Sequence, residues 1–332
     1  MAIKDTSEIQ AKPYFSVVMP VYNKEPHIAR SIESVLDQTF TDFELIIVCD
    51  PSTDNSNYEV EKFLDPRIRV FYRNEPGPGG YAARNLGVLK SKAEWIAFLD
   101  ADDEWFIDYL FTVHQSISKL NRPCFVGSGW KTFDPTSGNE PQINAYHKEN
   151  KNKGLHTIDF KEYLYYDFNI KRPFNTSTAV IKRDILIKSG LFPAGKAHRG
   201  GDVDTWLRCA FICEGLAINN YIGACYHRDS VNMVTKHSID DASSIRSSIK
   251  EILNLTDDSE TRYLLKKLSN YYTRGAWSKN FYSKNYIKNF NLSKALYYEI
   301  DTKTSVILGI ISLLPDEIIL KIRDINKSIK EL

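Results

Sequence analysis

The alternation of short apolar runs with amphipathic segments between residues 15 and 120 constrains the fold of this chain most strongly. Each run has the length of a buried strand, and each is followed by apolar residues at helical spacing. This alternation is typical of a mostly parallel sheet with helices on both faces. Such sheets bind ligands at the carboxyl ends of their strands, so functional side chains are expected just after residues 19, 48 and 99. The expected strands are Phe15–Met19, Glu44–Val48, Ile68–Tyr72 and Trp95–Leu99, and the expected helices are His27–Gln38, Asn55–Leu64, Tyr81–Leu89 and Trp105–Leu120.

The remainder of the chain divides into an α/β part and a helical part. Residues 134–156 are polar and rich in turn-forming residues, which predicts a loop. Thr178–Lys182 is a further expected strand, and Asp202–Glu214 an expected helix. From about residue 240 the strand-like runs end. The predicted organisation is a polar tail at 1–13, an α/β domain at 14–235 and a helical region at 236–332.

Composition narrows the function classes. The 332 residues carry a net charge of only +1, which gives no indication of a nucleic-acid partner. The five cysteines show no zinc-binding pattern and are expected to be single buried thiols in a reducing compartment. The first residues lack the apolar core of a signal peptide, and no apolar run reaches the roughly 18 residues of a membrane span. A cytoplasmic protein is expected, either soluble or peripheral on the inner face of the membrane.

Acidic side chains gather where the expected strands end. Asp50 and Asp54 follow the second strand, and Asp100, Asp102 and Asp103 follow the fourth. Asp54 and Asp103 are equally interpretable as helix N-caps. Carboxylates crowded at the end of a buried strand repel one another, and a divalent cation removes that cost. Because Mg²⁺ and Mn²⁺ favour carboxylate and phosphate oxygens together, this cluster predicts a metal site beside a diphosphate.

A glycine-rich turn at residues 76–80 precedes Arg84 in the expected helix 81–89. Glycines let the backbone approach a ligand closely, and a helix N-terminus favours phosphate. Arg84 can pair with phosphate or stack on a base. The alternative is a flexible turn followed by a surface arginine.

Taken together, these segments resemble family 2 glycosyltransferases with the GT-A fold. The resemblance covers about residues 14–230, and its motifs are specific as a set. It is carried by FSVVMPVYNKEPHIARSIESVLDQTFTDFELIIV, CDPSTDNS, YAARNLGVLKSKAEWIAFLDADD, TSTAVIKRDILIKSGLFP and GGDVDTWLRCA. It implies a GT-A type, Rossmann-like nucleotide-binding domain.

The resemblance also implies roles for residues of the nucleotide-sugar site. Pro20, Tyr22 and Glu25 would line the nucleotide pocket, Asp50 would hydrogen-bond the base, and Arg84 would contact the base or the diphosphate.

A second group of implied roles concerns the metal and the chemistry. Asp100 and Asp102 match the family's acidic metal motif, which takes Mn²⁺ or Mg²⁺, with Asp102 as the direct ligand. Asp202 matches the acid that supplies the catalytic base. His227 follows an expected strand, where it would either ligate the metal or lie at the surface as an ordinary histidine.

The chain departs from the family pattern at three positions. Cys49 replaces an acid and Pro51 a glycine in the nucleotide motif, and Gly201 replaces the glutamate that usually precedes Asp202. Asp204 is therefore a rival for the catalytic base. Since positions i and i+2 of a helix face different ways, only one of the two acids can point at the substrate, and Asp202 is preferred.

The implied activity is inverting transfer of a sugar from a UDP-sugar donor. The acceptor would be a hydroxyl of a saccharide or a lipid-linked oligosaccharide in cell-surface polysaccharide synthesis, where many family members use a lipid-diphosphate carrier. Two alternatives stay open: a sugar-phosphate nucleotidyltransferase and an inactive nucleotide-sugar-binding protein. The oligomeric state is open as well.

Residues 261–298 carry eight basic side chains and no acidic one, with aromatic residues between them. Such a segment suits an anionic membrane surface, but it equally suits a helical cap whose aromatic rings pack on the catalytic domain. A last amphipathic helix is expected from Ile318, Ile322, Ile325 and Ile329. The basic residues are Arg262, Lys266, Lys267, Arg274, Lys279, Lys284, Lys288 and Lys294.

Overall fold

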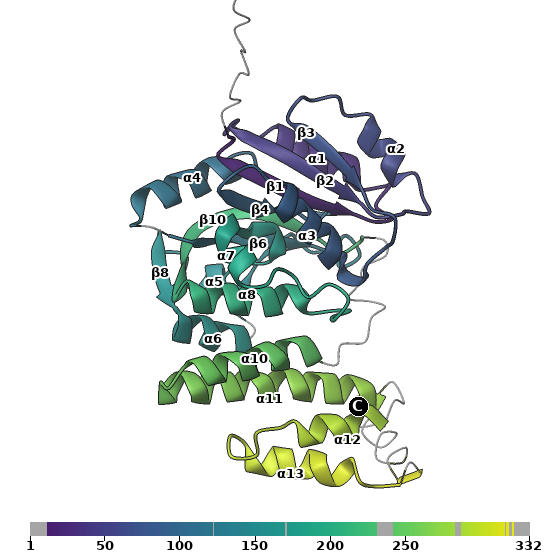
Figure 1. The fold of residues 1–332 in the computed structure, drawn as a ribbon, viewed down its shortest axis with the longest axis vertical. Coiled ribbons are helices and arrows are strands. Elements are labelled where there is room, and N and C mark those ends of the chain that lie inside the picture. The colour runs from purple at the N-terminus through teal and green to yellow at the C-terminus, as the bar shows by residue number, and fades with distance from the viewer. Residues whose placement is uncertain are drawn as a thin grey trace, which may run out of the picture.

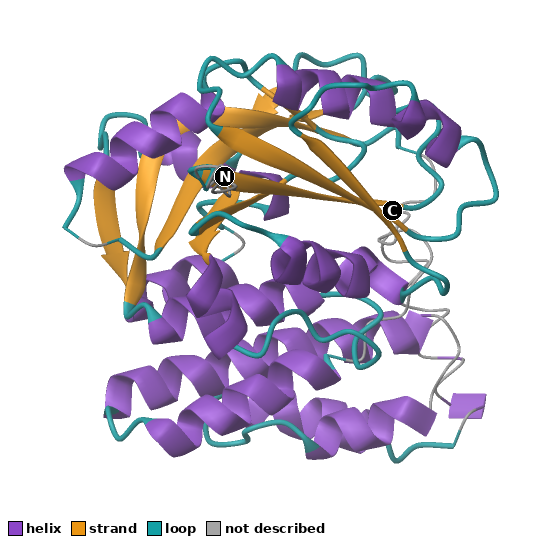
Figure 2. Ribbon diagram, turned by 45° about the horizontal axis from the view of Figure 1, so that its top comes forward, coloured by secondary structure: helices purple, strands orange, loops and turns teal. Residues whose placement is uncertain are grey.

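The computed structural model describes residues 12–121, 123–169, 171–230, 242–282, 287–315, 317–318 and 321. A large mixed sheet forms the upper part of the molecule, with helices on both of its faces and further helices stacked beneath (Figures 1 and 2). The order of the strands is β3-β2-β1-β4-β9-β6-β10-β5, with β7 beside β6 and β8 beside β10. The strands are β1 Phe15–Val21, β2 Phe43–Cys49, β3 Ile68–Tyr72, β4 Trp95–Phe98, β5 Glu104–Trp105, β6 Phe125–Phe133, β7 Gln142–Ile143, β8 His156–Asp159, β9 Ala179–Lys182 and β10 Gly215–His227.

The first half of the sheet is parallel, as the sequence predicts. β1 pairs in parallel with both β2 and β4, and β2 with β3. All seven residues of β2 are buried, which is typical of a strand covered on both faces. Side chains of β1 alternate between two cores: Val17 and Met19 belong to one core with Ile28 and Leu110, and Val18 belongs to the other with Leu207. The second half begins with β9, which runs antiparallel to both β4 and β6.

The five helices that the apolar spacing predicts in the α/β part are present, whereas α5, α6 and α7 are not predicted. One predicted helix begins later than expected, because Glu104–Trp105 pairs with β10 and the helix starts at Tyr109. The indole of Trp105 is buried, and its Nε1 donates to the carbonyl of Ser177 at 2.6 Å, so tertiary contacts override helix propensity here. The helices are α1 Ile28–Leu36, α2 Ser56–Glu61, η1 Pro78–Gly80, α3 Tyr81–Lys90, α4 Tyr109–Lys119, α5 Ala145–Glu149, α6 Phe160–Phe168, η2 Thr176–Thr178, α7 Arg183–Lys188 and α8 Gly201–Ile212.

The expectation of a loop at residues 134–156 is wrong in part. The segment contains β7 and α5, and α5 buries Tyr146 and His147. His147 is 2% exposed, and its Nε2 lies 3.1 Å from the carbonyl oxygen of Asn219 in β10. The polar composition of residues 134–156 does not reveal these elements, because the short helix α5 is held by only two buried side chains, Tyr146 and His147.

The burial of His147 predicts an acid-sensitive stability. Desolvation lowers the pKa of His147 from 6.5 to about 4. The unfolded chain therefore takes up a proton below pH 6.5 that the folded chain refuses, and stability falls as the pH drops from 6.5 towards 4. At pH 5 this histidine should cost about 2 kcal/mol relative to pH 7. Urea unfolding of wild type and His147→Gln at both pH values measures the difference. An equal pH dependence in the two proteins would contradict the assignment.

The C-terminal part of the described chain is helical, as predicted. α10 packs against α8, and α11 packs against α6, so this region is seated on the α/β part (Figure 1). Trp277 and Phe281 of α11 are 6% and 4% exposed, and Trp277 Nε1 donates to the Ser312 hydroxyl at 2.8 Å, so this ring is held within the helical region itself. Lys284, Ile322, Ile325 and Ile329 lie outside the described residues. The helices are α10 Ser243–Leu255, α11 Ser259–Tyr282, α12 Ile287–Lys294 and α13 Thr302–Ile311.

The expectation of five single thiols is wrong for two cysteines. Cys124 and Cys213 form a disulfide, with Cα atoms 6.1 Å apart and a sequence separation of 89. Cys49, Cys209 and Cys225 are free and buried. The sequence could not reveal this pair, because only the packing of the segment before β6 against the end of α8 brings the two positions together.

None of the helices in the described ranges is long and apolar enough to cross a membrane.

Candidate active site

The carboxyl ends of β1, β2 and β4 open onto a cavity of about 570 Å³, where the sequence places the functional side chains. Seven of the predicted site residues line this one cavity, and Glu25 and His227 do not. The glycine-rich turn and the start of α3 form a further wall. The seven residues are Pro20, Tyr22, Asp50, Arg84, Asp100, Asp102 and Asp202.

The two carboxylates after β4 differ in their surroundings. Arg84 from α3 forms an ion pair with Asp100 Oδ1. Burial raises the pKa of Asp100, and Arg84 offsets only part of that effect. Burial also acts on Asp102, but Lys24 Nζ at 2.7 Å and the Ser230 hydroxyl at 2.7 Å lower its pKa. Lys24 and Ser230 were not predicted from the sequence.

The Asp102 carboxylate suits a cation. Among the described residues, both side chains that donate to it donate to Oδ2, and Asp102 lines the same cavity as Asp100. Two carboxylates on one wall are the oxygen donors that Mg²⁺ and Mn²⁺ prefer, and a bound cation would replace Lys24 as the compensating charge. These residues therefore fit the predicted metal.

The glycine-rich turn is shaped by its side-chain neighbours. Gly79 and Gly80 adopt φ values of +70° and +67°. A Cβ atom on Gly79 would lie 2.5 Å from the ring of Tyr81, so glycine is required there. The carbonyl of Gly79 accepts a hydrogen bond of 2.7 Å from Arg84, which fixes the guanidinium beside Asp100. Arg84 is therefore a buried part of the cavity wall and not a surface arginine.

Asp50 and Glu25 hold loops around the cavity. Asp50 is 2% exposed; its Oδ1 pairs with Arg73 at 2.5 Å and its Oδ2 accepts from the backbone N–H of Gly77 at 3.2 Å. Glu25 lies outside the lining, where its carboxylate accepts hydrogen bonds from the backbone and side chain of Asn55. These contacts link the loop after β1 to the loop after β2.

Of the two acids considered for the base, only Asp202 reaches the cavity. It lies in the first turn of α8, and Thr176 Oγ1 donates to its Oδ2 at 3.4 Å. Asp204 is 1% exposed and forms an ion pair with Arg208 at 2.8 Å inside the protein. This separation follows from the i and i+2 spacing on a helix.

The departure at Gly201 has a steric reason. A Cβ atom there would lie 2.7 Å from Pro193 Cγ and 2.8 Å from the Tyr81 ring. The backbone N–H of Gly201 donates to the Tyr81 hydroxyl at 2.9 Å. The Tyr81 ring thus occupies the space that a glutamate side chain at position 201 would need. Tyr81 also lines the cavity, so its hydrogen bond to Gly201 connects the start of α8 with the cavity wall. The sequence did not single out this residue.

The buried Asp204–Arg208 pair predicts a structural role that can be separated from that of Asp202. Asp204→Ala leaves Arg208 without its carboxylate and should lower the free energy of unfolding by about 3 kcal/mol. Asp202→Asn, on the same helix but at the cavity, should change it by less than about 0.5 kcal/mol. Urea unfolding of both variants measures this. A stable Asp204→Ala protein would show that the ion pair is dispensable.

His227 lies beside a different acid from the one expected. It is 6% exposed, and its Nε2 is 3.1 Å from Glu104 Oε1 across the β5–β10 pair. Cys225 on the same strand completes a group whose potential ligand atoms lie within 4.8 Å of one another. His227 is therefore not brought to the cavity of Asp100 and Asp102, although its backbone N–H donates to Asp103 at 3.2 Å.

Asp103 is a buried, hydrogen-bonded carboxyl group and does not cap a helix. It is 1% exposed, and Ser177 Oγ donates to its Oδ2 at 2.6 Å. Burial and the charges of Asp102 and Asp100 raise its pKa well above the usual range. Asp54 is not the N-cap either: it precedes Asn55, the N-cap residue of α2, and accepts from the backbone N–H of Ser56 at 3.0 Å.

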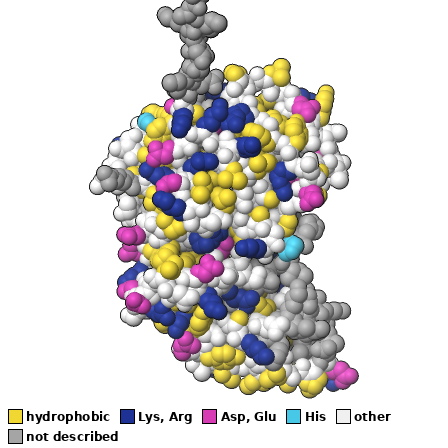
Figure 3. All heavy atoms as spheres, viewed as in Figure 1, with side chains coloured by type: hydrophobic (Ala, Val, Ile, Leu, Met, Phe, Trp, Pro, Cys, Tyr) yellow, Lys and Arg dark blue, Asp and Glu magenta, His cyan; other side chains and the backbone are white. Residues whose placement is uncertain are grey.

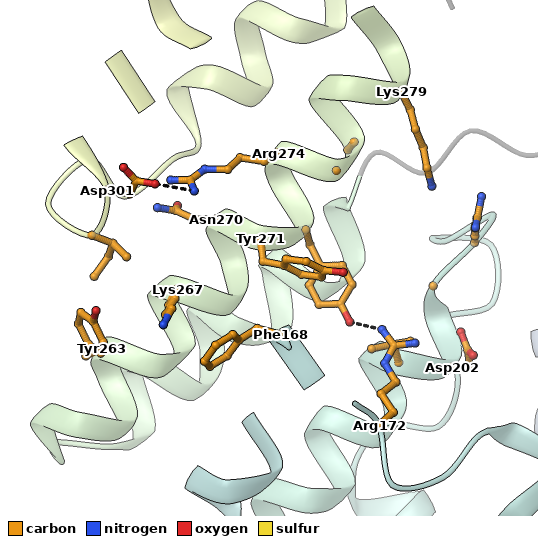
Figure 4. Close-up of a pocket in the computed structure, with 17 residues that line it drawn as sticks. Phe168, Arg172, Asp202, Tyr263, Lys267, Asn270, Tyr271, Arg274, Lys279 and Asp301 are labelled. Atoms are coloured by element: carbon orange, nitrogen blue, oxygen red, sulfur yellow. Dashed lines mark hydrogen bonds and ion pairs between the residues drawn. The ribbon is translucent and has the colours of Figure 1, made fainter. Parts of the chain in front are cut away.

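Two further cavities adjoin the first at Asp202. One, of about 230 Å³, shares Asp100, Thr176 and Asp202 with it and extends to Trp206. The other, of about 820 Å³, lies along α11, with Phe168 of α6 and Asp202 of α8 among its lining residues (Figure 4). Asp202 is on the wall of all three cavities, so a ligand in any of them can reach this carboxylate.

Comparison with solved structures shows the fold. S. aureus TarS 1-349 in complex with UDP-GlcNAc superposes with a TM-score of 0.73, covering 90% of this chain and 88% of that chain at 16% identity. The GT-A fold expected from the sequence is confirmed, together with the helices that follow the catalytic sheet.

Curated relatives are similar over shorter stretches. Escherichia coli WfgD, a UDP-Glc:alpha-D-GlcNAc-diphosphoundecaprenol beta-1,3-glucosyltransferase, is 36% identical over 144 residues, which are 42% of this chain and 56% of WfgD. Bacillus subtilis TuaG, named for teichuronic acid biosynthesis, is 40% identical over 101 residues, which are 30% of this chain and 40% of TuaG. The chain thus spans little more than half the length of WfgD and less of TuaG. The sequence model of glycosyl transferase family 2 matches residues 16–190, more than half of the chain, and the chain therefore belongs to this family.

Proposed function

We propose that this protein transfers a sugar from a UDP-sugar donor, with inversion, to a hydroxyl of a saccharide or lipid-linked saccharide in cell-surface polysaccharide synthesis. Family membership supports the glycosyl transfer. The donor class is supported by the names of WfgD, which uses UDP-Glc, and of TarS, solved with UDP-GlcNAc. WfgD acts on a sugar diphosphoundecaprenol and TuaG is named for teichuronic acid, which supports the polysaccharide context.

One observation carries the proposal: Asp202 lies where the cavity of the predicted nucleotide residues meets two further cavities. An inverting transferase needs a base between donor and acceptor, and a carboxylate at this junction can accept the proton of an acceptor hydroxyl. The donor would occupy the cavity lined by Tyr22, Asp50 and the glycine-rich turn, and the acceptor one of the others.

The side chains of the donor cavity suit a nucleoside diphosphate. Backbone at the start of α3 and the guanidinium of Arg84 would face the phosphates. Asp100 and Asp102 would hold Mn²⁺ or Mg²⁺, which supplies positive charge for the departing diphosphate when bound. Lys24 and Arg84 balance these carboxylates in the protein alone.

The proposed reaction is one displacement. The acceptor oxygen forms a bond to the anomeric carbon while the bond from that carbon to the UDP oxygen breaks, and Asp202 takes the hydroxyl proton. UDP leaves as the second product. Because attack comes from the face opposite the leaving group, a UDP-α-sugar gives a β-glycoside, and no covalent enzyme intermediate forms.

Donor hydrolysis by the purified protein tests the function. UDP-glucose, UDP-galactose, their N-acetyl forms and GDP-mannose are supplied with Mn²⁺ or with EDTA, and released nucleotide is measured. We expect metal-dependent UDP release from one donor and, once a saccharide acceptor is added, a β-anomeric signal in NMR spectra of the transfer product. Pyrophosphate as product would favour the nucleotidyltransferase alternative. UDP binding without turnover of any donor would favour an inactive binding protein.

We also propose a peripheral contact with the inner face of the membrane, made by the helical region 236–332. Hydrophobic side chains gather at the lower end of the molecule, over α13 (Figure 3). Ile310 and Leu313 are 56% and 69% exposed there. Co-sedimentation with anionic liposomes should fall for Ile310→Asp, and no binding of the wild type at low salt would refute the contact. This proposal includes the division of the chain near residue 235 into an α/β domain and a helical region.

A further inference from the structure

The cavity of about 820 Å³ along α11 is the largest of the three that Asp202 lines, and basic side chains outnumber acidic ones in its walls. Its lining holds two acids, Asp202 and Asp301, against five basic side chains. Low-dielectric walls that carry one sign of charge concentrate ligands of the opposite sign. The basic residues are Arg172, Arg199, Lys267, Arg274 and Lys279.

Helix α11 supplies more of the lining than any other element. Five of its lining residues, Tyr263, Lys267, Asn270, Tyr271 and Arg274, follow one another along one face, where residues three and four apart are neighbours. Elsewhere on the same helix, Leu265 and Leu268 are buried in the core. The positive charge is therefore held by a helix whose orientation is fixed by packing.

Two of these cations retain capacity for a ligand. Arg274 pairs with Asp301 at 2.8 Å, but its Nε and Nη2 atoms are buried and have no hydrogen-bond partner. Lys267 Nζ lies 4.2 Å from the centroid of the Phe168 ring and pairs with no carboxylate of the described residues. Donors without an acceptor are costly, so a guanidinium that is only partly hydrogen-bonded favours an anion beside it.

Arg172 differs from these two. Its Nε pairs at 2.5 Å with Asp167, which is 1% exposed, and its Nη2 donates to the Tyr272 hydroxyl at 2.5 Å. Its charge is thus largely compensated within the protein. In the view of Figure 4, Arg274 and Lys267 lie on one side of Tyr271, and Arg172 and Asp202 on the other. The cavity has the proposed base at one end and the available cations at the other.

We propose that this cavity binds the phosphate-bearing part of the acceptor, with Lys267 and Arg274 as its anion ligands and the acceptor hydroxyl directed to Asp202. The inference rests on the proposed glycosyl transfer and assigns the acceptor a chemical class, a saccharide carrying phosphate. The phosphate could belong to the diphosphate of a lipid-linked sugar or to a phosphodiester polymer. Both offer the oxygen atoms that a guanidinium and an ammonium bind.

Calorimetric titration of UDP-saturated protein tests this, since UDP occupies the donor cavity. The probes are octyl diphosphate, a glycerol phosphate oligomer and the neutral octyl maltoside. We expect at least one phosphate probe to bind, with affinity reduced about tenfold in Lys267→Gln and in Arg274→Ala. Lys266→Ala is the matched control: Lys266 is the adjacent residue of α11, pairs with Glu299 at 2.9 Å and lies outside the cavity lining. It should bind the probes as the wild type does.

Each outcome is decisive. Tighter binding of octyl diphosphate assigns the site to a lipid-linked diphosphate, and tighter binding of the oligomer assigns it to a phosphodiester polymer. No binding of either phosphate probe, or undiminished binding in both Lys267→Gln and Arg274→Ala, overturns the inference. The initial UDP titration separates this from the proposed function: failure of UDP to bind refutes the donor site, whereas UDP binding without phosphate binding refutes only the acceptor assignment.

Discussion

Replacement of Asp202 by Asn should lower kcat for sugar transfer by about 10³-fold. The amide has the same size as the carboxylate but cannot accept the proton that the acceptor hydroxyl must lose. Asp202 lies at the junction of the three cavities, and Thr176 is its hydrogen-bond donor at 3.4 Å, a contact that an amide oxygen can also accept. The loss should therefore be in kcat, with the folded structure intact.

The measurement is transfer at saturating donor and acceptor, with UDP affinity determined in parallel. Unchanged UDP affinity together with lost turnover would identify a group that acts in the chemical step. Asp204→Asn is the comparison: Asp204 is as close in sequence but is paired with Arg208 inside the protein, so it should affect stability more than turnover. Transfer within tenfold of wild type in Asp202→Asn would show that the base is elsewhere.

Replacement of Asp102 by Asn should abolish metal-dependent donor hydrolysis, with a loss of about 10³-fold, or roughly 4 kcal/mol. The amide can keep an oxygen acceptor for Lys24 and Ser230, which donate to Asp102 Oδ2. It removes the negative charge that would hold a cation on the cavity wall. Chelation by EDTA should reduce the wild-type rate to a similar level and leave the variant unchanged.

The same assay decides between two places for the cation. Glu104, His227 and Cys225 form a compact group of potential ligands away from the cavity lining. Glu104→Gln removes the acid of that group and should retain metal-dependent hydrolysis. Loss of hydrolysis in Glu104→Gln, with activity kept in Asp102→Asn, would move the functional metal to the β5–β10 pair.

The sequence by itself determined the parallel half of the sheet and seven of the residues that line the cavity at its edge. Strands such as β2 could be predicted because a strand that is buried on both faces needs a continuous apolar run. The acidic residues that follow such a run are easily recognised in the sequence. Since parallel strands end at a common edge, Asp50, Asp100 and Asp102 had to lie near one another. Their roles in binding and catalysis remain predictions.

Only the tertiary structure decided which partner each of these groups has. Lys24 and Ser230 meet Asp102 although they are 78 and 128 residues away in sequence, and His227 pairs with Glu104 instead of the cavity acids. Tyr81 fills the space beside Gly201, which explains why this chain has glycine where the family usually has glutamate. The cationic cavity likewise needs α11 to pack against α6, a contact between segments about 100 residues apart. Local spacing fixes which face of a helix is apolar, but the partners of a polar side chain depend on long-range packing, which no local pattern encodes.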